Sequence, residues 1–314
     1  MENRLFVSSS PHLRDNTSTS RIMLDVIIAL VPAAAAGVWF YGLRALLVIL
    51  VTMAAAVASE YLMRVGLKRE QTISDLSAAV TGLLLALNLP PSIPIWMAIV
   101  GAILAVALIK QLFGGLGQNF MNPALGARVM MVVAWAGRMT AWIDPVTDAV
   151  TSATPLGMLK EGGAKALYMD MFWGNIAGCI GETSTAAILI GFAYLLVRKV
   201  ISWRIPVIFT GTVALLTWVL GPDGMFTGDP LYHVLGGGLL LGAVFMATDY
   251  VTNPITRKGI VIYAIGCGVL TTLFRLYGNM PEGVSFAIIL MNIVTPLIDR
   301  YTVPVSFGGE RRVE

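Results

Sequence analysis

Long apolar runs constrain this chain more than any other feature of its sequence. About ten runs reach, or nearly reach, the length of about 20 apolar residues that a helix needs to cross a membrane. They cover residues 22–42, 43–63, 73–89, 94–113, 121–137, 184–198, 204–221, 231–248, 259–278 and 284–302. Only 12% of the 314 residues are charged, whereas soluble domains carry about 25%. We therefore predict an all-α, polytopic membrane protein.

The distribution of basic residues predicts how these helices are oriented. The first 21 residues are polar and contain no apolar signal core. With this segment in the cytoplasm, most of the 21 Lys and Arg residues fall on the cytoplasmic side, as membrane proteins prefer. The predicted parts are a cytoplasmic segment (1–21), a five-helix unit (22–137), an extracytoplasmic loop (138–182), a second five-helix unit (183–302) and a cytoplasmic tail (303–314).

The two five-helix units contain similar segments. "SDLSAAVTGLLLAL" (74–87) resembles "GETSTAAILIGFAYLL" (181–196), and each begins with an acid followed by hydroxyls and small residues. Because five is an odd number, the second copy would be inverted in the membrane; chance similarity between apolar helices is the alternative. Asp75 and Glu182 occupy matching positions. Acids near the membrane are functional candidates, so we consider both for ion coupling or for shaping a site.

A polar, hydroxyl-rich stretch, "TDAVTSATPL" (147–156), interrupts this apolar chain. Ser and Thr before Pro favour a turn, because their hydroxyls bond nearby backbone and the proline restricts the preceding residue. One interpretation is therefore an ordinary turn leading to a helix that starts near Pro155. The other is that one hydroxyl is an attachment point, since a threonine can carry a phosphoester.

Four segments of the chain resemble one known family. Residues 148–154, "DAVTSAT", resemble the flavinylation pattern D-x-x-[ST]-G-A-T of the RnfD and NqrB subunits of ion-translocating membrane redox complexes. "SPHLRDNTSTSRIMLDVIIALVPAAAAGVWFYGLRAL" (10–46), "NFMNPALGARV" (119–129) and "FMATDYVTNPITRKG" (245–259) also resemble family signatures. The resemblance covers about residues 8–305, and the length of the chain suits RnfD.

This resemblance implies a covalent cofactor. In the family, the phosphate of FMN is esterified to the last threonine of the pattern, which is Thr154 here, by a separate flavin transferase outside the cytoplasm. Asp148 and Thr151 would belong to the pattern that the transferase recognises, together with Ser152 and Ala153. Ser152 stands where the family has glycine, and we expect this small polar residue to be tolerated.

The resemblance also implies a function and a setting. The chain would be the RnfD subunit of an Rnf complex, relaying electrons through FMN between ferredoxin and NAD, coupled to Na⁺ or H⁺ translocation. Its fold would be similar to that of urea transporters, in the bacterial inner membrane, with both termini cytoplasmic and the flavin loop extracytoplasmic. Expected partners are membrane lipid, the flavin transferase and the membrane, FMN-carrying and iron–sulfur subunits of the complex, with no nucleic acid.

The chain is not expected to hold a complete active site by itself. It has no dinucleotide fingerprint and no cysteine pattern for an iron–sulfur cluster, so other subunits would handle NAD and ferredoxin. We predict no catalytic residue and no metal ligand in this chain. A urea-transporter-like channel or carrier for a small solute is the alternative function, although a pore has no need of a flavinylation motif.

Two further places could hold a cofactor. Asn122 lies where a broken helix should open, and Arg128 lies within that helix, where an arginine needs an anionic partner. A cofactor phosphate would serve, and so would an acid such as Asp75 or Glu60. Thr248 and Asp249 begin a second copy of the pattern T-D-x-V-T. They predict either an ordinary helix end or a cytoplasmic-side site for a cation or for a second, non-covalent flavin such as riboflavin.

Overall fold

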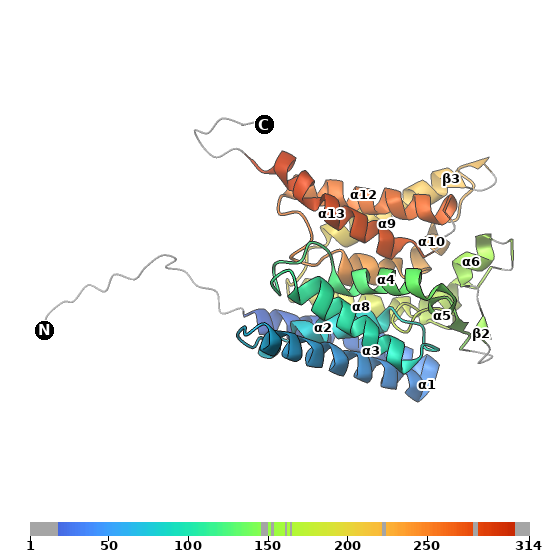
Figure 1. Ribbon diagram of the computed structural model, residues 1–314. Coiled ribbons are helices and arrows are strands. Elements are labelled where there is room, and N and C mark those ends of the chain that lie inside the picture. The colour runs from blue at the N-terminus through green and yellow to red at the C-terminus, as the bar shows by residue number, and fades with distance from the viewer. Residues whose placement is uncertain are drawn as a thin grey trace, which may run out of the picture.

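The computed structural model describes residues 18–145, 150–151, 154–160, 162–163, 165–221, 224–278 and 282–304. Almost all of its regular structure is helical (Figure 1), which confirms the mainly α architecture. Up to the polar loop, the helices are α1 (Thr19–Gly66), η1 (Ile73–Asp75), α2 (Ser77–Leu87), α3 (Ile95–Ile103), the π-helix η2 (Leu104–Gln111), α4 (Pro123–Ala134) and α5 (Ala136–Met139).

The rest of the described chain continues this pattern. The helices there are α6 (Pro155–Lys160), α7 (Tyr168–Trp173), α8 (Thr185–Val197), α9 (Arg204–Val219), α10 (Pro230–Leu235), α11 (Leu239–Leu241), the π-helix η3 (Gly242–Met246), α12 (Arg257–Leu276) and α13 (Val284–Thr302). Two antiparallel pairs of two-residue strands accompany them: β1 (Trp142–Ile143) with β2 (Val150–Thr151), and β3 (Leu220–Gly221) with β4 (Gly224–Met225).

Each predicted apolar run contains helix, but several of these helices are interrupted. The first two runs form α1, whose only non-helical residue is Gly42, with φ 68°, a left-handed conformation that glycine adopts readily. The run 94–113 is divided between α3 and η2, and the run 231–248 among α10, α11 and η3. Among the described residues, α1, α12 and α13 are long and apolar enough to cross a membrane by length and composition.

The helices pack in two groups that α4 connects. α1 packs against α2, α3 and α8, while α12 packs against α9 and α13. α4 contacts α2 and η2 on one side and α13 on the other, and it lies between the two groups in Figure 1. A single apolar core runs through both groups, with residues such as Leu30, Leu85 and Phe209 fully buried.

The two similar segments run in opposite directions. The hydroxyl of Ser20 in α1 donates to the carbonyl of Ser74, just before α2, at 2.9 Å. The far end of α2 adjoins the start of α8, because the amide of Gly181 donates to the carbonyl of Leu87 at 2.8 Å. The end of α8 returns to α1, where Arg198 pairs with Asp25 at 3.2 Å. α2 and α8 therefore begin at opposite ends of the bundle.

The ends of the bundle are distinct. The start of α1 and the end of α13 lie at one end, whereas α6, β2 and β3 lie at the other (Figure 1). We call these the termini end and the loop end.

Close packing of α8 on α1 gives a test of the fold. A Cβ added to Gly191 would lie 2.1 Å from the carbonyl oxygen of Ala29, so Gly191→Ala should force the helices apart. We expect destabilisation of about 1–3 kcal/mol, measured as a lower thermal midpoint in detergent. Gly211→Ala is the control, since nothing lies within 4 Å of its added Cβ. Equal midpoints for the two variants would contradict this packing.

Candidate functional site

Thr154 lies directly before α6 at the loop end. Its hydroxyl accepts a hydrogen bond from the Gly157 amide at 3.3 Å, and its carbonyl accepts one from Met158 at 2.8 Å. Thr followed by Pro is a favourable helix start, because the threonine caps the first turn and the proline lacks an amide that would need a partner. The predicted helix start near Pro155 is therefore confirmed. Thr154 is only 4% exposed, which the sequence does not reveal.

A buried carboxyl lies near the Thr154 side chain. It belongs to Glu282, between α12 and α13; burial raises its pKa, whereas the nearby Thr154 hydroxyl lowers it. The same carboxyl pairs with Arg128 of α4, whose Nη2 lies 3.4 Å from Oε2. Side-chain exposure is 8% for Arg128 and 14% for Glu282. The attachment residue predicted from the sequence therefore adjoins a buried ion pair.

Arg128 binds partners from several segments besides Glu282. Its Nη1 donates to Asn88 Oδ1 at 3.0 Å and to Ser285 Oγ at 2.9 Å. Its Nη2 also contacts Cys179 Sγ at 3.4 Å. A buried guanidinium needs such a set, because unpaired charge is expensive away from water.

A second acid completes the group. Glu182 Oε1 accepts from the Cys179 amide at 2.8 Å, and Glu182 is 6% exposed. One ligand atom from each of Cys179, Glu182 and Glu282 lies within 4.8 Å of the others. We call Thr154, Arg128, Cys179, Glu182 and Glu282 the Thr154 cluster.

Electrostatics in the Thr154 cluster are strongly perturbed. Burial is the largest influence on Glu282, and nearby Glu182 adds to it; together they raise the pKa of Glu282 to about 8 against the opposing effect of Arg128. Burial also raises the pKa of the Cys179 thiol well above its usual range, so this cysteine is a neutral thiol.

A second buried arginine adjoins the cluster. Arg275 of α12 donates through Nη1 to the His233 carbonyl and through Nη2 to the carbonyls of Gly236, at 2.9 Å, and Gly237, at 3.2 Å. Its Nε is buried without a hydrogen-bond partner among the described residues. A buried donor of this kind can receive an anionic oxygen.

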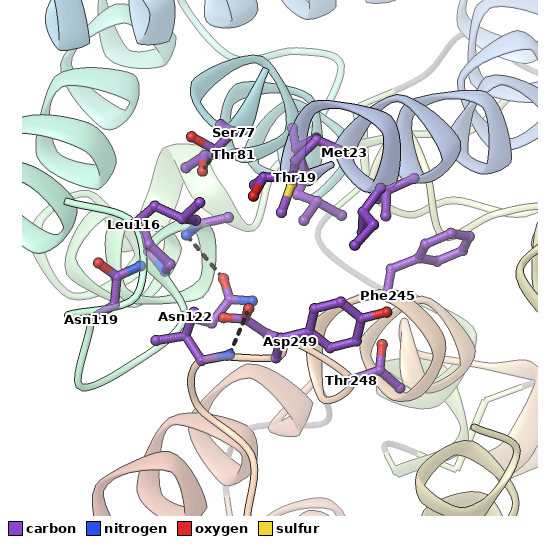
Figure 2. A pocket seen from close by; sticks show the side chains of 18 of the residues that line it. Thr19, Met23, Ser77, Thr81, Leu116, Asn119, Asn122, Phe245, Thr248 and Asp249 are labelled. Atoms are coloured by element: carbon purple, nitrogen blue, oxygen red, sulfur yellow. Dashed lines mark hydrogen bonds between the residues drawn. The ribbon is translucent and has the colours of Figure 1, made fainter. Parts of the chain in front are cut away.

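A second candidate site lies at the termini end. A cavity of about 280 Å³ opens between the start of α1, the start of α2, the segment before α4 and the segment after η3. Figure 2 shows Ser77, Thr81, Asn119, Asn122 and Asp249 around it. Most of the lining is apolar, with polar groups at a few points, as is usual for sites that bind an organic ligand. We call it the Asp249 pocket.

The predicted residues Asn122, Thr248 and Asp249 all line this pocket. Asn122 caps α4, its Oδ1 accepting from the Ala124 amide at 3.1 Å. Thr248 donates to the Val244 carbonyl at 2.6 Å, so its hydroxyl is already engaged. For Asp249, burial raises the pKa of the carboxyl, against hydrogen bonds from the Val251 amide and the Thr252 hydroxyl.

Buried polar contacts connect the pocket with the Thr154 cluster. Asn122 Nδ2 donates to the Met246 carbonyl at 3.3 Å, and Asn88 Nδ2 lies 3.6 Å from Met246 Sδ. Asn88 Oδ1 in turn accepts from Arg128. The sequence places Asn122 and Arg128 on one helix, and the structure shows that the two sites adjoin opposite parts of α4.

One sequence-based hypothesis about Arg128 is wrong in its particulars. The acid that pairs with it is Glu282, and neither Asp75 nor Glu60 does so. Glu60 is instead fully buried and pairs with Lys110 at 3.0 Å, while Asp75 accepts from the Ser77 amide at 2.7 Å. The reason is direction: α4 carries Arg128 away from the termini end, where both of those acids lie.

Part of the predicted motif lies outside the described residues. This applies to Asp148, Ser152 and Ala153. Of Thr151 the structure describes the backbone, which pairs with Trp142 across β1 and β2.

Sequence reasoning alone misses three functional candidates. Glu282 belongs to a short loop outside any motif, and Cys179 appears as an ordinary apolar-loop cysteine. The charge distribution assigns Lys110 to the cytoplasmic surface, yet it is 1% exposed within η2 and lines the Asp249 pocket. A lone lysine inside the apolar run "AVALIKQLF" is the available signal, because a charge within an apolar helix requires a partner.

Comparison with known proteins identifies the family of this chain. The family model described as the NQR2, RnfD, RnfE family matches residues 6–308. The D subunit of the Na⁺-translocating ferredoxin:NAD⁺ oxidoreductase complex of Acetobacterium woodii is 49% identical over 313 residues, covering 98% of this chain and 96% of the relative.

Two further relatives are similar over nearly their whole length. The D subunit of the proton-translocating ferredoxin:NAD⁺ oxidoreductase complex of Clostridium ljungdahlii is 49% identical over 324 residues, covering 99% of this chain and 98% of the relative. The D subunit of the ion-translocating oxidoreductase complex of Stutzerimonas stutzeri is 40% identical over 335 residues, covering 94% of each. This chain therefore belongs to the NQR2, RnfD, RnfE family.

The buried Arg128–Glu282 pair gives a test by double-mutant cycle. Either Arg128→Leu or Glu282→Leu leaves one buried charge unpaired, which should destabilise the protein by about 3–5 kcal/mol. The double variant should lose less stability than the sum of the two single variants, because neither charge remains. Thermal midpoints of the purified proteins provide the measurement, and Arg138→Leu, at an exposed arginine, is the control. Strict additivity would contradict the pairing.

Proposed function

We propose that this chain is the membrane-embedded D subunit of an ion-translocating ferredoxin:NAD oxidoreductase complex, in which it carries FMN on Thr154 and relays electrons. Membership of the NQR2, RnfD, RnfE family, and relatives named as the D subunits of such complexes, support the function. The observation that carries the cofactor assignment is the position of Thr154 near Glu282, the carboxyl that pairs with buried Arg128. The chemistry of the complex is shared with its other subunits, which bind NAD and ferredoxin.

The residues around Thr154 fit a flavin phosphate. An FMN phosphate esterified to threonine is a phosphodiester, which is anionic and rich in acceptor oxygens. Arg128 lies within the same cluster, and the buried Nε of Arg275 is a donor without a partner among the described residues. These two arginines would hold the phosphate, since charge-assisted bonds to phosphate are the strong ones. When bound, the flavin supplies the one-electron and two-electron chemistry.

Burial of Thr154 implies an order of events. A transferase must reach the hydroxyl, but the folded structure leaves Thr154 only 4% exposed. α6 is held down by the Tyr232 hydroxyl, which donates to the Pro155 carbonyl at 3.0 Å, and by Lys160, which donates to the Gly278 carbonyl. We infer that the flavin is attached before α6 docks, or while it is undocked.

The proposed setting is the bacterial inner membrane, with about ten membrane-spanning segments in two inverted, urea-transporter-like repeats. The opposite directions of α2 and α8, and the interrupted helices, support inverted repeats. The start of α1 and the end of α13 lie at one end and α6 lies at the other (Figure 1), which supports cytoplasmic termini and an extracytoplasmic flavin loop. Partners are the other subunits of the complex, membrane lipid and a flavin transferase that acts on Thr154.

The Asp249 pocket is our candidate for the second, non-covalent flavin. Its volume of about 280 Å³ and largely apolar lining suit a planar ring system. Asn119 Oδ1 is buried there without a hydrogen-bond partner among the described residues, as expected of a group that awaits a ligand donor. The alternative channel function gains no support from the three relatives described above, whose names are those of redox complexes.

Substitution of the proposed attachment residue tests the cofactor assignment. Thr154→Val keeps the shape of the side chain but removes its hydroxyl, so no phosphoester can form. After co-expression with a flavin transferase, the wild-type chain should show flavin fluorescence in a denaturing gel and one FMN adduct by mass spectrometry. Thr154→Val should show neither, while Thr140→Val, outside the motif, should retain both. Fluorescence that persists in Thr154→Val would mean that another residue carries the flavin.

Filling the Asp249 pocket tests the second flavin independently. Ala124 is 1% exposed and lines the pocket from α4, so Ala124→Phe should occupy the space. Acid extraction of the purified complex should then release less flavin than extraction of the wild type, while the covalent FMN remains on the chain. Val133→Phe is the matched control on the same helix, at a position that is 73% exposed. Undiminished extractable flavin in Ala124→Phe would place that cofactor elsewhere.

A further inference from the structure

Two carboxyl groups of the Thr154 cluster lie close together, and each has one oxygen without a hydrogen-bond partner among the described residues. Glu182 and Glu282 each present an oxygen within 4.8 Å of the other and of Cys179 Sγ. Glu182 Oε2 and Glu282 Oε1 are buried and have no hydrogen-bond partner among the described residues. Buried acceptors without donors are rare in folded proteins and require an explanation. Each of these two oxygens therefore has a lone pair that can bind a proton.

The charged groups around the pair do not supply a donor to these two oxygens. From α4, Arg128 contacts Glu282 but is not bonded to Glu182. From α12, Arg275 directs its Nη groups to backbone carbonyls, and those include the carbonyl of His233 of α10. From the segment before α8, Cys179 contributes its amide to Glu182 Oε1.

A metal ion is a poor explanation for this geometry. The guanidinium of Arg128 already contacts both Cys179 Sγ and Glu282 Oε2 at 3.4 Å. A metal bound by these ligands would lie against a fixed positive charge. A proton meets the need directly, because it converts one of two neighbouring acceptors into a donor, and two adjacent buried carboxylates do not readily both ionise.

We propose that Glu182 and Glu282 form a proton-binding site that holds one proton between them, and that this proton balances charge on the flavin at Thr154. The first half of the proposal concerns the protein alone. The second half rests on the proposed function, since it requires the flavin. Thr154 links the two, because its side chain lies near Glu282.

The charge balance is simple. An electron held by a flavin on Thr154, supplied from the ferredoxin side of the complex, would add one negative charge beside the acid pair. That charge strengthens proton binding by the pair, which takes up a proton from water at the loop end. Oxidation by the next acceptor removes the electron, and the proton returns to water. Where the pair is unprotonated before the electron arrives, one electron and one proton thus arrive and leave together.

This charge balance fixes the direction in which pH changes the midpoint potential of the Thr154 flavin. With the pKa of Glu282 already raised to about 8, and raised further by an added electron, proton uptake occurs around and above pH 8. In that range the midpoint potential of the Thr154 flavin falls as pH rises. At lower pH the pair is protonated in both redox states and contributes no slope.

Redox titration of the purified, flavinylated complex tests the second half. In the wild type, the acid pair should make the midpoint potential of the Thr154 flavin fall as pH rises. Its contribution should approach a tenfold change in the equilibrium constant per pH unit, or about 59 mV for one electron. This contribution adds to any pH dependence of the flavin itself. Glu182→Gln and Glu282→Gln should each reduce the slope. Glu70→Gln, at an exposed acid of the termini end, should not. Glu182→Gln keeps the Arg128–Glu282 pair, so it remains informative if Glu282→Gln folds poorly.

Infrared spectroscopy tests the first half without flavin. In a complex that carries Thr154→Val, a pH-difference spectrum should show the C=O band of a buried protonated carboxyl. That band should vanish or shift in Glu182→Gln and in Glu282→Gln but persist in Glu70→Gln.

The two tests separate failure of this inference from failure of the proposed function. Absence of the carboxyl band, or identical slopes in wild type and both acid variants, would overturn the proton-binding site. Absence of covalent flavin in wild type would overturn the proposed function and, with it, the flavin half of this proposal, while a carboxyl band would still support the site itself.

Discussion

The structure depends above all on the burial of one arginine, Arg128, in an apolar bundle. A guanidinium away from water must satisfy its donors and its charge. Arg128 does so with groups from three other segments: Asn88 after α2, Cys179 before α8, and Glu282 with Ser285 at the start of α13. These segments are far apart in the sequence, so the need to pair one charge brings the two groups of helices together around α4.

The chemistry of the loop end follows from the same constraint. Because Glu282 must reach Arg128, it is also held beside Thr154 and Glu182. The threonine proposed to carry FMN thus adjoins a cation that suits its phosphate and an acid pair that suits a proton. Asn88, which accepts a hydrogen bond from Arg128, also contacts Met246 at the end of η3. The segment that follows Met246 lines the Asp249 pocket. Both candidate sites therefore share one buried polar connection.

Much of the fold could be predicted because its signals are local. Apolar runs fix where helices form, since each run must bury or shield its own backbone polar groups. Thr154 followed by Pro155 predicted a helix start, and α6 begins there. The break at Gly42 falls at the predicted boundary between the runs 22–42 and 43–63, whereas the π-helical segments η2 and η3 were not predicted. Partners of buried charges could not be predicted, because an apolar sequence leaves the rotation of each helix open.

The sequence by itself determined that the chain is a helical membrane protein, and its motifs indicated the family to which the chain belongs. Both depend on patterns contained within single segments. Only the tertiary structure decided that Glu282, rather than Asp75 or Glu60, pairs with Arg128, that Lys110 is buried against Glu60, and that Thr154 is enclosed. The physical reason is that charge pairing and burial are set by distances between segments remote along the chain, and these exist only once the helices have packed.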